Sequence, residues 1–172
     1  MLVEIQALTA PVVGPTPRRV ANGMDGNRLV LLATVLSRRA QIPLGNQDVI
    51  VNVTGGLRVN DTSADLATAL AIVSSFKDQP LEQDIVALGE VGLGGEIRLV
   101  SQLGRRLQEA ARLGLRRAVI PEVAEIDLSD IKGIDIIPVS TLMQAILILF
   151  PRARSAARGE RITVTTEGED EA

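Results

Sequence analysis

The sequence of 172 residues contains no cysteine, no histidine, no tryptophan and no tyrosine. The absence of cysteine and histidine excludes disulfides, cysteine nucleophiles, Ser-His-Asp triads, zinc fingers and histidine-ligated metals. Only two phenylalanines supply aromatic rings, so base stacking has almost no side chains to work with. The core must be aliphatic, and we expect neither a metal nor another cofactor in this chain.

Long hydrophobic runs are also missing. The longest unbroken apolar run, Ala145–Phe150, is far too short to cross a bilayer, and Met1 is followed at once by a strand-like segment. An apolar content of 46% nevertheless indicates a folded chain. We therefore expect a cytoplasmic protein with no membrane contact, with one domain over residues 1–152 and a disordered acidic tail over residues 153–172.

Charge is distributed unevenly along the chain. The net charge is −3, but five acids and one arginine lie from Glu160 onward, so residues 1–159 carry +1. Residues 98–117 contain six arginines against one glutamate, Glu109. This local excess indicates a basic face, and arginine suits bidentate phosphate contacts. Two other interpretations stay open: an arginine preference set by genome composition, and an exposed helix face balanced by Glu109.

Hydrophobic spacing predicts alternating strands and helices. Strands are expected at residues 2–13, 48–54, 57–59, 85–88, 118–121 and 134–139, helices at about 25–40, 62–75, 101–114 and 142–150, and a glycine-punctuated hairpin at 89–97. Asp25 or Asn27 is expected to cap the first helix, Thr62 and Asp65 resemble a capping box, and Ser101 is expected to cap the third helix. The last helix is apolar nearly all round, which predicts burial. The order of elements predicts an α+β, or mixed α/β, fold with a mixed sheet.

Two segments, one rich in glycine and one containing Ser63, are candidates for a ligand-binding or catalytic site. The glycines between Gly89 and Gly95 open a strand instead of a helix, so they do not form a dinucleotide loop, and the sequence has no phosphate loop for ATP. Ser63 lies near a predicted helix N-terminus, where backbone amides stabilise anions. Taken by itself, it is more simply interpreted as an ordinary first-turn residue beside a cap.

Several segments together resemble the Lon-type serine–lysine peptidases. They are Asp61-Thr62-Ser63-Ala64, the hairpin from Gly89 to Ile97, and Leu103-Gly104-Arg105-Arg106-Leu107. The resemblance puts Ser63 at the nucleophile position and Arg106 at the position of the catalytic lysine. A hydroxyl nucleophile needs a neighbour that can lose a proton near pH 7, and a guanidinium keeps its proton at any usable pH. The resemblance therefore implies a Lon-type fold with a vestigial, inactive dyad.

Further segments resemble the C-terminal domain of the RadA (Sms) family of bacterial DNA repair proteins. They are residues 2–8, 16–19, 27–29, 52–56 and 62–67. The resemblance implies a longer parent with an N-terminal zinc motif and a RecA-like ATPase, which drives branch migration in recombination as a homo-hexamer. ATP, magnesium and zinc are then expected only for those other domains, and the start within a strand predicts that this chain is a piece.

We therefore predict a proteolytically inactive scaffold of a hexameric ring that offers DNA a sequence-independent, phosphate-binding surface. The candidate DNA-binding residues are Arg105, Arg112, Arg116, Arg117, Arg18, Arg19 and Lys77, and less firmly Arg106. Arg106 is alternatively expected to pair with Asp61 or Asp65. Two other functions stay open: an active serine peptidase whose base is Lys77 or Lys132, and an oligomerisation scaffold without DNA contact.

Overall fold

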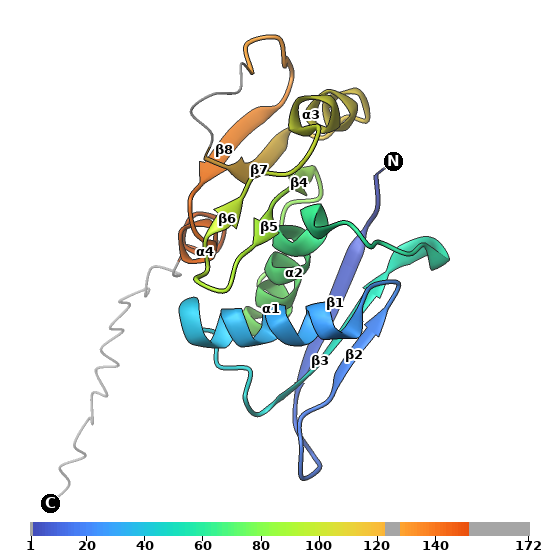
Figure 1. Ribbon diagram of the computed structural model, residues 1–172, viewed down its shortest axis with the longest axis vertical. Helices are drawn as coiled ribbons and strands as arrows, with labels where there is room; N and C mark the ends of the chain where they lie inside the picture. The colour runs from blue at the N-terminus through green and yellow to red at the C-terminus, as the bar shows by residue number, and fades with distance from the viewer. Residues whose placement is uncertain (1, 123–127, 152–172) are drawn as a thin grey trace, which may run out of the picture.

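The computed structural model describes residues 2–122 and 128–151, in which helices and strands form a mixed α/β fold (Figure 1). The fold class predicted from the sequence is confirmed. The tail predicted over residues 153–172 lies outside the described residues. Among the described helices, none is both long enough and apolar enough to cross a membrane.

The first sheet contains three strands in the order β1-β3-β2. Its elements and the two helices that pack on it are β1 (Ile5–Pro11), β2 (Arg19–Asn22), β3 (Gln47–Val53), α1 (Gly26–Arg39) and α2 (Asp65–Lys77). Strand β1 runs antiparallel to β3, and β2 runs parallel to it. Helix α1 begins as predicted, because the Asp25 carboxylate accepts the Asn27 N–H.

The second sheet contains three parallel strands in the order β4-β7-β8. Its elements are β4 (Ile85–Ala87), β7 (Arg117–Pro121), β8 (Asp135–Val139), and the helices α3 (Leu103–Arg112) and α4 (Leu142–Leu149). The predicted hairpin is present between β5 (Glu90–Val91) and β6 (Ile97–Arg98). The Ile97 N–H donates to the Ser140 carbonyl at 2.9 Å, so the hairpin is tied to the start of α4.

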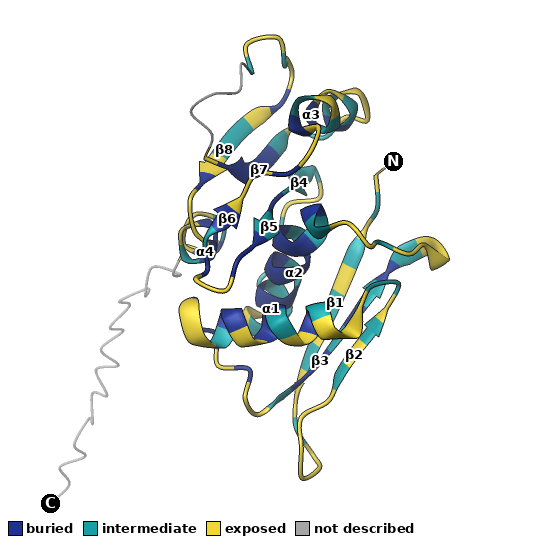
Figure 2. Ribbon diagram, in the orientation of Figure 1, coloured by how far each residue is buried: buried dark blue, intermediate teal, exposed yellow. Residues whose placement is uncertain are grey.

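Two aliphatic cores hold these layers together, and Figure 2 shows α2 buried over most of its length. The larger core joins α1, α2, β3 and α4, and its fully buried side chains include Leu29, Leu32, Leu36 and Leu66. The smaller core lies under α3 and includes Leu103, Leu107, Ala118 and Ile120. The predicted aliphatic interior is confirmed. Helix α3 and the start of α2 thus belong to different cores.

The local structure departs from the predictions at three places. Strand β2 was not predicted, and pairing with β3 supplies its backbone partners. Residues 57–59 form no strand and follow a 3₁₀ turn, Thr54–Gly56 (η1). Helix α4 is buried on one side only, since Leu147 is 62% and Ile148 43% exposed. The helix therefore carries apolar side chains on its exposed side as well as on its buried side.

The start of α3 also differs from the prediction. Ser101 does not cap the helix. Gln102 occupies the cap position in the left-handed region, with φ of 56°, and makes no side-chain capping bond. The Ser101 carbonyl accepts a hydrogen bond from Arg106 instead, at 3.0 Å. The first turn of α3 is thus held by an arginine side chain of the same helix.

Candidate functional site

Ser63 lies in a short 3₁₀ turn, Thr62–Ala64 (η2), directly before α2. The residue is only 4% exposed. Its N–H donates to Asp61 Oδ1 at 2.9 Å, and its carbonyl accepts from the Gly89 N–H at 3.0 Å. The Leu66 N–H then donates to the Gly89 carbonyl at 3.1 Å. These bonds fix the turn against the chain that leaves β4.

Arg106 occupies the space beside the Ser63 hydroxyl. Its Nη1 donates to Ser63 Oγ at 3.0 Å, and its Nη2 donates to Asp61 Oδ2 at 2.5 Å. Its Nε donates to the Ser101 carbonyl. The hydroxyl oxygen is therefore an acceptor from a permanent cation, and a guanidinium is no proton acceptor. The two positions identified from the sequence, 43 residues apart, are in direct contact.

The prediction that Arg106 pairs with an aspartate is confirmed for Asp61 and wrong for Asp65. Hydrogen bonding from the Ser63 N–H and from Arg106 lowers the pKa of the Asp61 carboxyl below its ordinary value. The lowered pKa keeps the Asp61 carboxylate charged in mild acid. The Asp61 carboxylate thus joins the turn η2 to helix α3.

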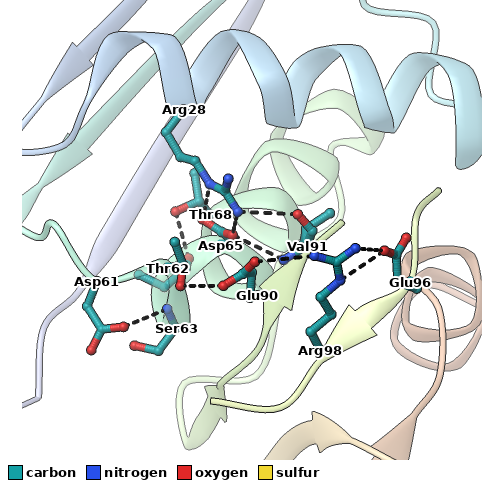
Figure 3. Close-up of polar contacts among 11 residues, drawn as sticks. Arg28, Asp61, Thr62, Ser63, Asp65, Thr68, Glu90, Val91, Glu96 and Arg98 are labelled. Atoms are coloured by element: carbon teal, nitrogen blue, oxygen red, sulfur yellow. Dashed lines mark hydrogen bonds and ion pairs between the residues drawn. The ribbon is translucent and has the colours of Figure 1, made fainter. Parts of the chain in front are cut away.

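Asp65 forms a second, buried ion pair with Arg28 of α1 (Figure 3). Asp65 is 2% exposed. Arg28 donates through Nε to Asp65 Oδ1 at 2.9 Å and through Nη2 to Asp65 Oδ2. The Val91 N–H donates to Asp65 Oδ2 at 3.1 Å, and the Val91 carbonyl accepts from Arg28 at 3.2 Å. The pair therefore locks α1, α2 and the hairpin together at one point.

The capping box expected from Thr62 and Asp65 is not formed. Thr62 Oγ1 donates to Glu90 Oε2 at 2.7 Å, and Ala64 occupies the cap position of α2. Asp61 instead caps the preceding 3₁₀ turn. The reason lies outside the local sequence: Arg28 engages the Asp65 carboxylate, and Glu90 engages the Thr62 hydroxyl.

The carboxylates of the hairpin are held by Arg98, which lies between them in Figure 3. Arg98 donates to Glu96 Oε1 at 2.5 Å and lies 3.8 Å from Glu90 Oε1. The backbone N–H of Glu96 and then Arg98 lower the pKa of the Glu96 carboxyl. Each carboxylate already has a cation beside it. This arrangement is typical of a structural hairpin rather than of an acid–base pair.

The lysines do not reach Ser63. Lys77 ends α2, and a helix of 13 residues separates its two ends by about 20 Å. Within the described residues, neither Lys77 nor Lys132 hydrogen-bonds to the Ser63 hydroxyl, whose partner is Arg106. Sequence reasoning missed Arg28 as part of this site. Its helical position was evident, but its partner stands 37 residues further along the chain.

The candidate DNA-binding residues fall into two groups. Arg18, Arg19 and Arg117 have partners within the protein: Arg18, whose side chain stays 74% exposed, pairs with Asp48, Arg19 donates to the carbonyls of Gln47 and Leu44, and Arg117 pairs with Glu82. The Asp48 hydrogen bond raises the pKa of Arg18, and burial lowers that of Arg19. These cations serve the packing of the strands and their connections.

The other group is exposed. Arg105, Arg116 and Lys77 make no ion pair within the described residues. Arg112 is 3.5 Å from Glu109, one helical turn away on α3. Arg105 and Arg112 lie on α3, and Arg116 follows that helix, so these three arginines belong to one region of the molecule. Lys77 lies apart from them, at the end of α2.

Known proteins resemble this chain closely. Residues 31–124 match the family model described as subunit ChlI of Mg-chelatase, which covers more than half of the chain. "DNA repair protein RadA" of Aquifex aeolicus is 47% identical over 87% of this chain and 33% of its own length, and that of Escherichia coli is 48% identical over 86% and 32%. RadA of Salmonella typhimurium is 54% identical over 70% of this chain and 26% of its own length. The chain belongs to this ChlI-like family, and it is similar to the RadA proteins over most of its length.

The relatives are longer than this chain, which spans about a third of the length of the Aquifex aeolicus and Escherichia coli proteins. The resemblance to the RadA family noted from the motifs is thus confirmed over most of the chain. These relatives are described as DNA repair proteins.

Disruption of the Asp65–Arg28 pair is expected to destabilise the fold strongly. An Arg28→Met substitution leaves a buried carboxylate without its cation, which costs about 3 kcal/mol. Adding Asp65→Asn removes the stranded charge, so the double variant is expected to lose less than the sum of the two single losses. Urea unfolding of the wild type, both single variants and the double variant measures the coupling. Additive losses would contradict the pairing.

The Asp61–Arg106 contact is expected to stabilise the protein in a pH-dependent way. Because the folded pKa of Asp61 lies below its ordinary value of 3.8, the stabilisation is present above that pH and is lost as pH falls through the folded pKa. The free energy of unfolding of the wild type should therefore exceed that of Asp61→Asn by about 0.5–1 kcal/mol at pH 7 and by less at pH 2.5. Urea midpoints at both pH values test this, with Asp135→Asn as the matched control. A difference that does not change with pH would refute the assignment.

Proposed function

We propose that this chain is the proteolytically inactive, Lon-type domain of a RadA-like DNA repair protein, and that it contacts DNA through exposed cations around α3. The observation that carries the proposal is the separation of the arginines into two groups. A cation that already has a partner in the protein, as Arg117 has in Glu82, has less of its charge free for a ligand. Within the described residues, Arg105 and Arg116 are exposed and make no ion pair, so their charge is available to phosphates.

The contact would be made to the sugar–phosphate backbone. Phosphate contacts carry no sequence information and weaken steeply with salt. Among the residues considered, Arg105, Arg112 and Arg116 are the favoured contacts, and Lys77 is a separate, weaker candidate. Arg18, Arg19 and Arg117 take a structural role in this proposal, because their donors already bind carboxylates or carbonyls.

The loss of peptidase activity follows from the chemistry beside Ser63. Its hydroxyl would need a base, and the neighbouring group is the Arg106 guanidinium. Asp65, which could repel a developing oxyanion, is neutralised by Arg28 and remains a structural residue. We therefore assign Ser63 and Arg106 to the connection between η2 and α3, not to catalysis.

The remaining functions belong, in this proposal, to the longer protein. ATP hydrolysis with magnesium, the zinc motif and branch migration in the cytoplasm would reside in segments outside this chain. The domain would act there as part of a homo-hexameric ring. A scaffold that forms the ring without touching DNA is the second candidate, since α4 presents Leu147 and Ile148 to solvent.

Removal of the two unpaired arginines is expected to weaken DNA binding. In Arg105→Gln/Arg116→Gln, the affinity for duplex DNA should fall. The negative slope of log affinity against log salt should become shallower by about 2. Fluorescence anisotropy at several salt concentrations measures both. Arg38→Gln/Arg58→Gln removes the same charge from two other exposed, unpaired arginines and should change the binding much less. Equal losses in the two double variants, or no loss, would exclude this surface.

The protein is expected to cleave no peptide through Ser63. A fluorogenic peptide incubated with the wild type should release no more fluorophore than with Ser63→Ala, because no base removes the hydroxyl proton. Circular dichroism should show that both proteins remain folded. Turnover that disappears in Ser63→Ala would overturn the assignment and would direct attention to Lys77 and Lys132.

A further inference from the structure

Three exposed arginines and one exposed leucine lie along α3 and the turn that follows it. Arg105 and Arg112 are two helical turns apart, so they lie on the same side of α3. Leu113 is 53% exposed, and the exposed Arg116 follows it closely in the chain. Glu109 lies between the two helical arginines, 3.5 Å from Arg112. The α3 surface, defined by Arg105, Arg112, Leu113 and Arg116, therefore combines an excess of positive charge with an apolar side chain.

The sequence also contains a short, strongly acidic segment. Residues 167–171 read Glu-Gly-Glu-Asp-Glu, so every position except Gly168 carries a carboxylate. This acidic segment lies outside the described residues, and its charge is known from the sequence. Like charges at such a density repel one another, so the acidic segment gains free energy from a cationic partner.

The arginines that are nearest in sequence are separated from the acidic segment. Residues 152–161 contain several arginines, the last of which is Arg161, but Ile-Thr-Val-Thr-Thr stands between Arg161 and Glu167. β-Branched residues favour an extended backbone, and the six steps from Arg161 to Glu167 then span about 20 Å. This distance exceeds the Debye length of about 8 Å at physiological salt. We therefore expect the carboxylates to find their cations elsewhere in the molecule.

The chain that leads to the acidic segment is long enough to reach the α3 surface. Helix α3 shares the smaller core with β7, and α4 follows β8 of the same sheet, so both helices adjoin one sheet (Figure 1). Strands of this length measure about 17 Å. Residues 152–166 connect Pro151 to Glu167, and a chain of that length spans up to about 50 Å. The distance along the sheet is therefore well within reach.

We propose that the acidic segment binds the α3 surface of its own chain and competes there with DNA. Its carboxylates pair with the guanidinium groups of Arg105 and Arg116, which are exposed and make no ion pair within the described residues. Ile162 and Val164, which precede the acids, supply apolar side chains that match the exposed Leu113. The competition rests on the proposed DNA-binding function, whereas the contact within the chain does not.

The contact is expected to be reversible. Exposed ion pairs are individually weak, so the binding depends on several pairs and on the tether, which keeps the acids at a high local concentration. Salt screens each pair. Duplex DNA, which carries many more anionic groups, then displaces the acidic segment once it is present in excess. The segment thus sets a threshold for DNA binding without closing the surface permanently.

The absence of cysteine and tryptophan from the chain makes the contact measurable by fluorescence. A bimane dye is attached to Gly168→Cys, and Leu113→Trp puts a ring that quenches the dye on contact into the α3 surface. At about 50 mM salt, the dye should lose about half of the fluorescence that it shows at about 500 mM salt, because screening releases the segment. Leu8→Trp is the matched control, since Leu8 is 60% exposed on β1, and it should leave the dye unquenched.

The same dye reports on the arginines and on DNA. Arg105→Gln/Arg116→Gln should restore the fluorescence at low salt by about twofold, whereas Arg38→Gln/Arg58→Gln removes the same charge elsewhere and should leave the quenching in place. Saturating duplex DNA should restore the fluorescence as well. Circular dichroism and thermal unfolding check that each variant folds.

Neutralising the acids tests the competition from the other side. Asp170→Asn/Glu171→Gln should bind duplex DNA about threefold more tightly at about 50 mM salt, because fewer carboxylates occupy the arginines. Glu4→Gln/Asp78→Asn removes the same charge from two other positions that make no ion pair within the described residues, and it should change the affinity much less. Fluorescence anisotropy measures all three affinities.

The contact would be overturned by a dye that is not quenched at low salt, or by quenching that survives Arg105→Gln/Arg116→Gln. Quenching between one chain that carries only the dye and another that carries only the tryptophan would place the contact between copies and would also contradict the proposal. DNA that binds without restoring the fluorescence overturns the competition. If the chain binds no DNA but the salt-dependent quenching appears, the proposed function fails while the contact within the chain stands, so the two failures are distinguishable.

Discussion

The arrangement around Ser63 depends on one guanidinium. Arg106 reaches from α3, whose apolar face belongs to the smaller core, to Ser63 and Asp61, which precede α2 of the larger core. The same side chain holds the Ser101 carbonyl at the start of its own helix. A planar group with several fixed donors can satisfy three acceptors at once. The Arg106 side chain, which takes the place of a base beside Ser63, therefore also connects the smaller core to the larger one.

A second arginine, Arg28, also joins separate elements, and the carboxylate that it binds is buried. Arg28 neutralises Asp65 at the first turn of α2, and Val91 completes the shell of the carboxylate from the hairpin. A buried charge is tolerated only when its partners are in place, so α1, α2 and β5 must assemble together. Both ion pairs converge on the residues that flank Ser63. The turn that carries Ser63 is therefore held by contacts from α1, α3 and the hairpin.

Because some arginines pair with acidic groups and others do not, the number of arginines alone does not give the charge available at the surface. Arginines that are adjacent in sequence have different roles: Arg116 is exposed, whereas Arg117 binds Glu82. Arg105 is exposed, whereas its neighbour Arg106 contacts Ser63 and Asp61. The charge left for a ligand is therefore smaller and more localised than the count of six arginines within residues 98–117 implies.

The elements that depend on neighbours in sequence could be predicted from the sequence alone. Helix α1 with its Asp25 cap, the hairpin, and the buried strand β7 follow from spacing, capping and glycine placement, which act over a few residues. The contact between Ser63 and Arg106 was also indicated, through resemblance to a known family. Strand β2, the Arg28–Asp65 pair and the choice of exposed arginines were decided only by tertiary structure. Their partners lie far along the chain, and side-chain pairing over such distances has no local signature.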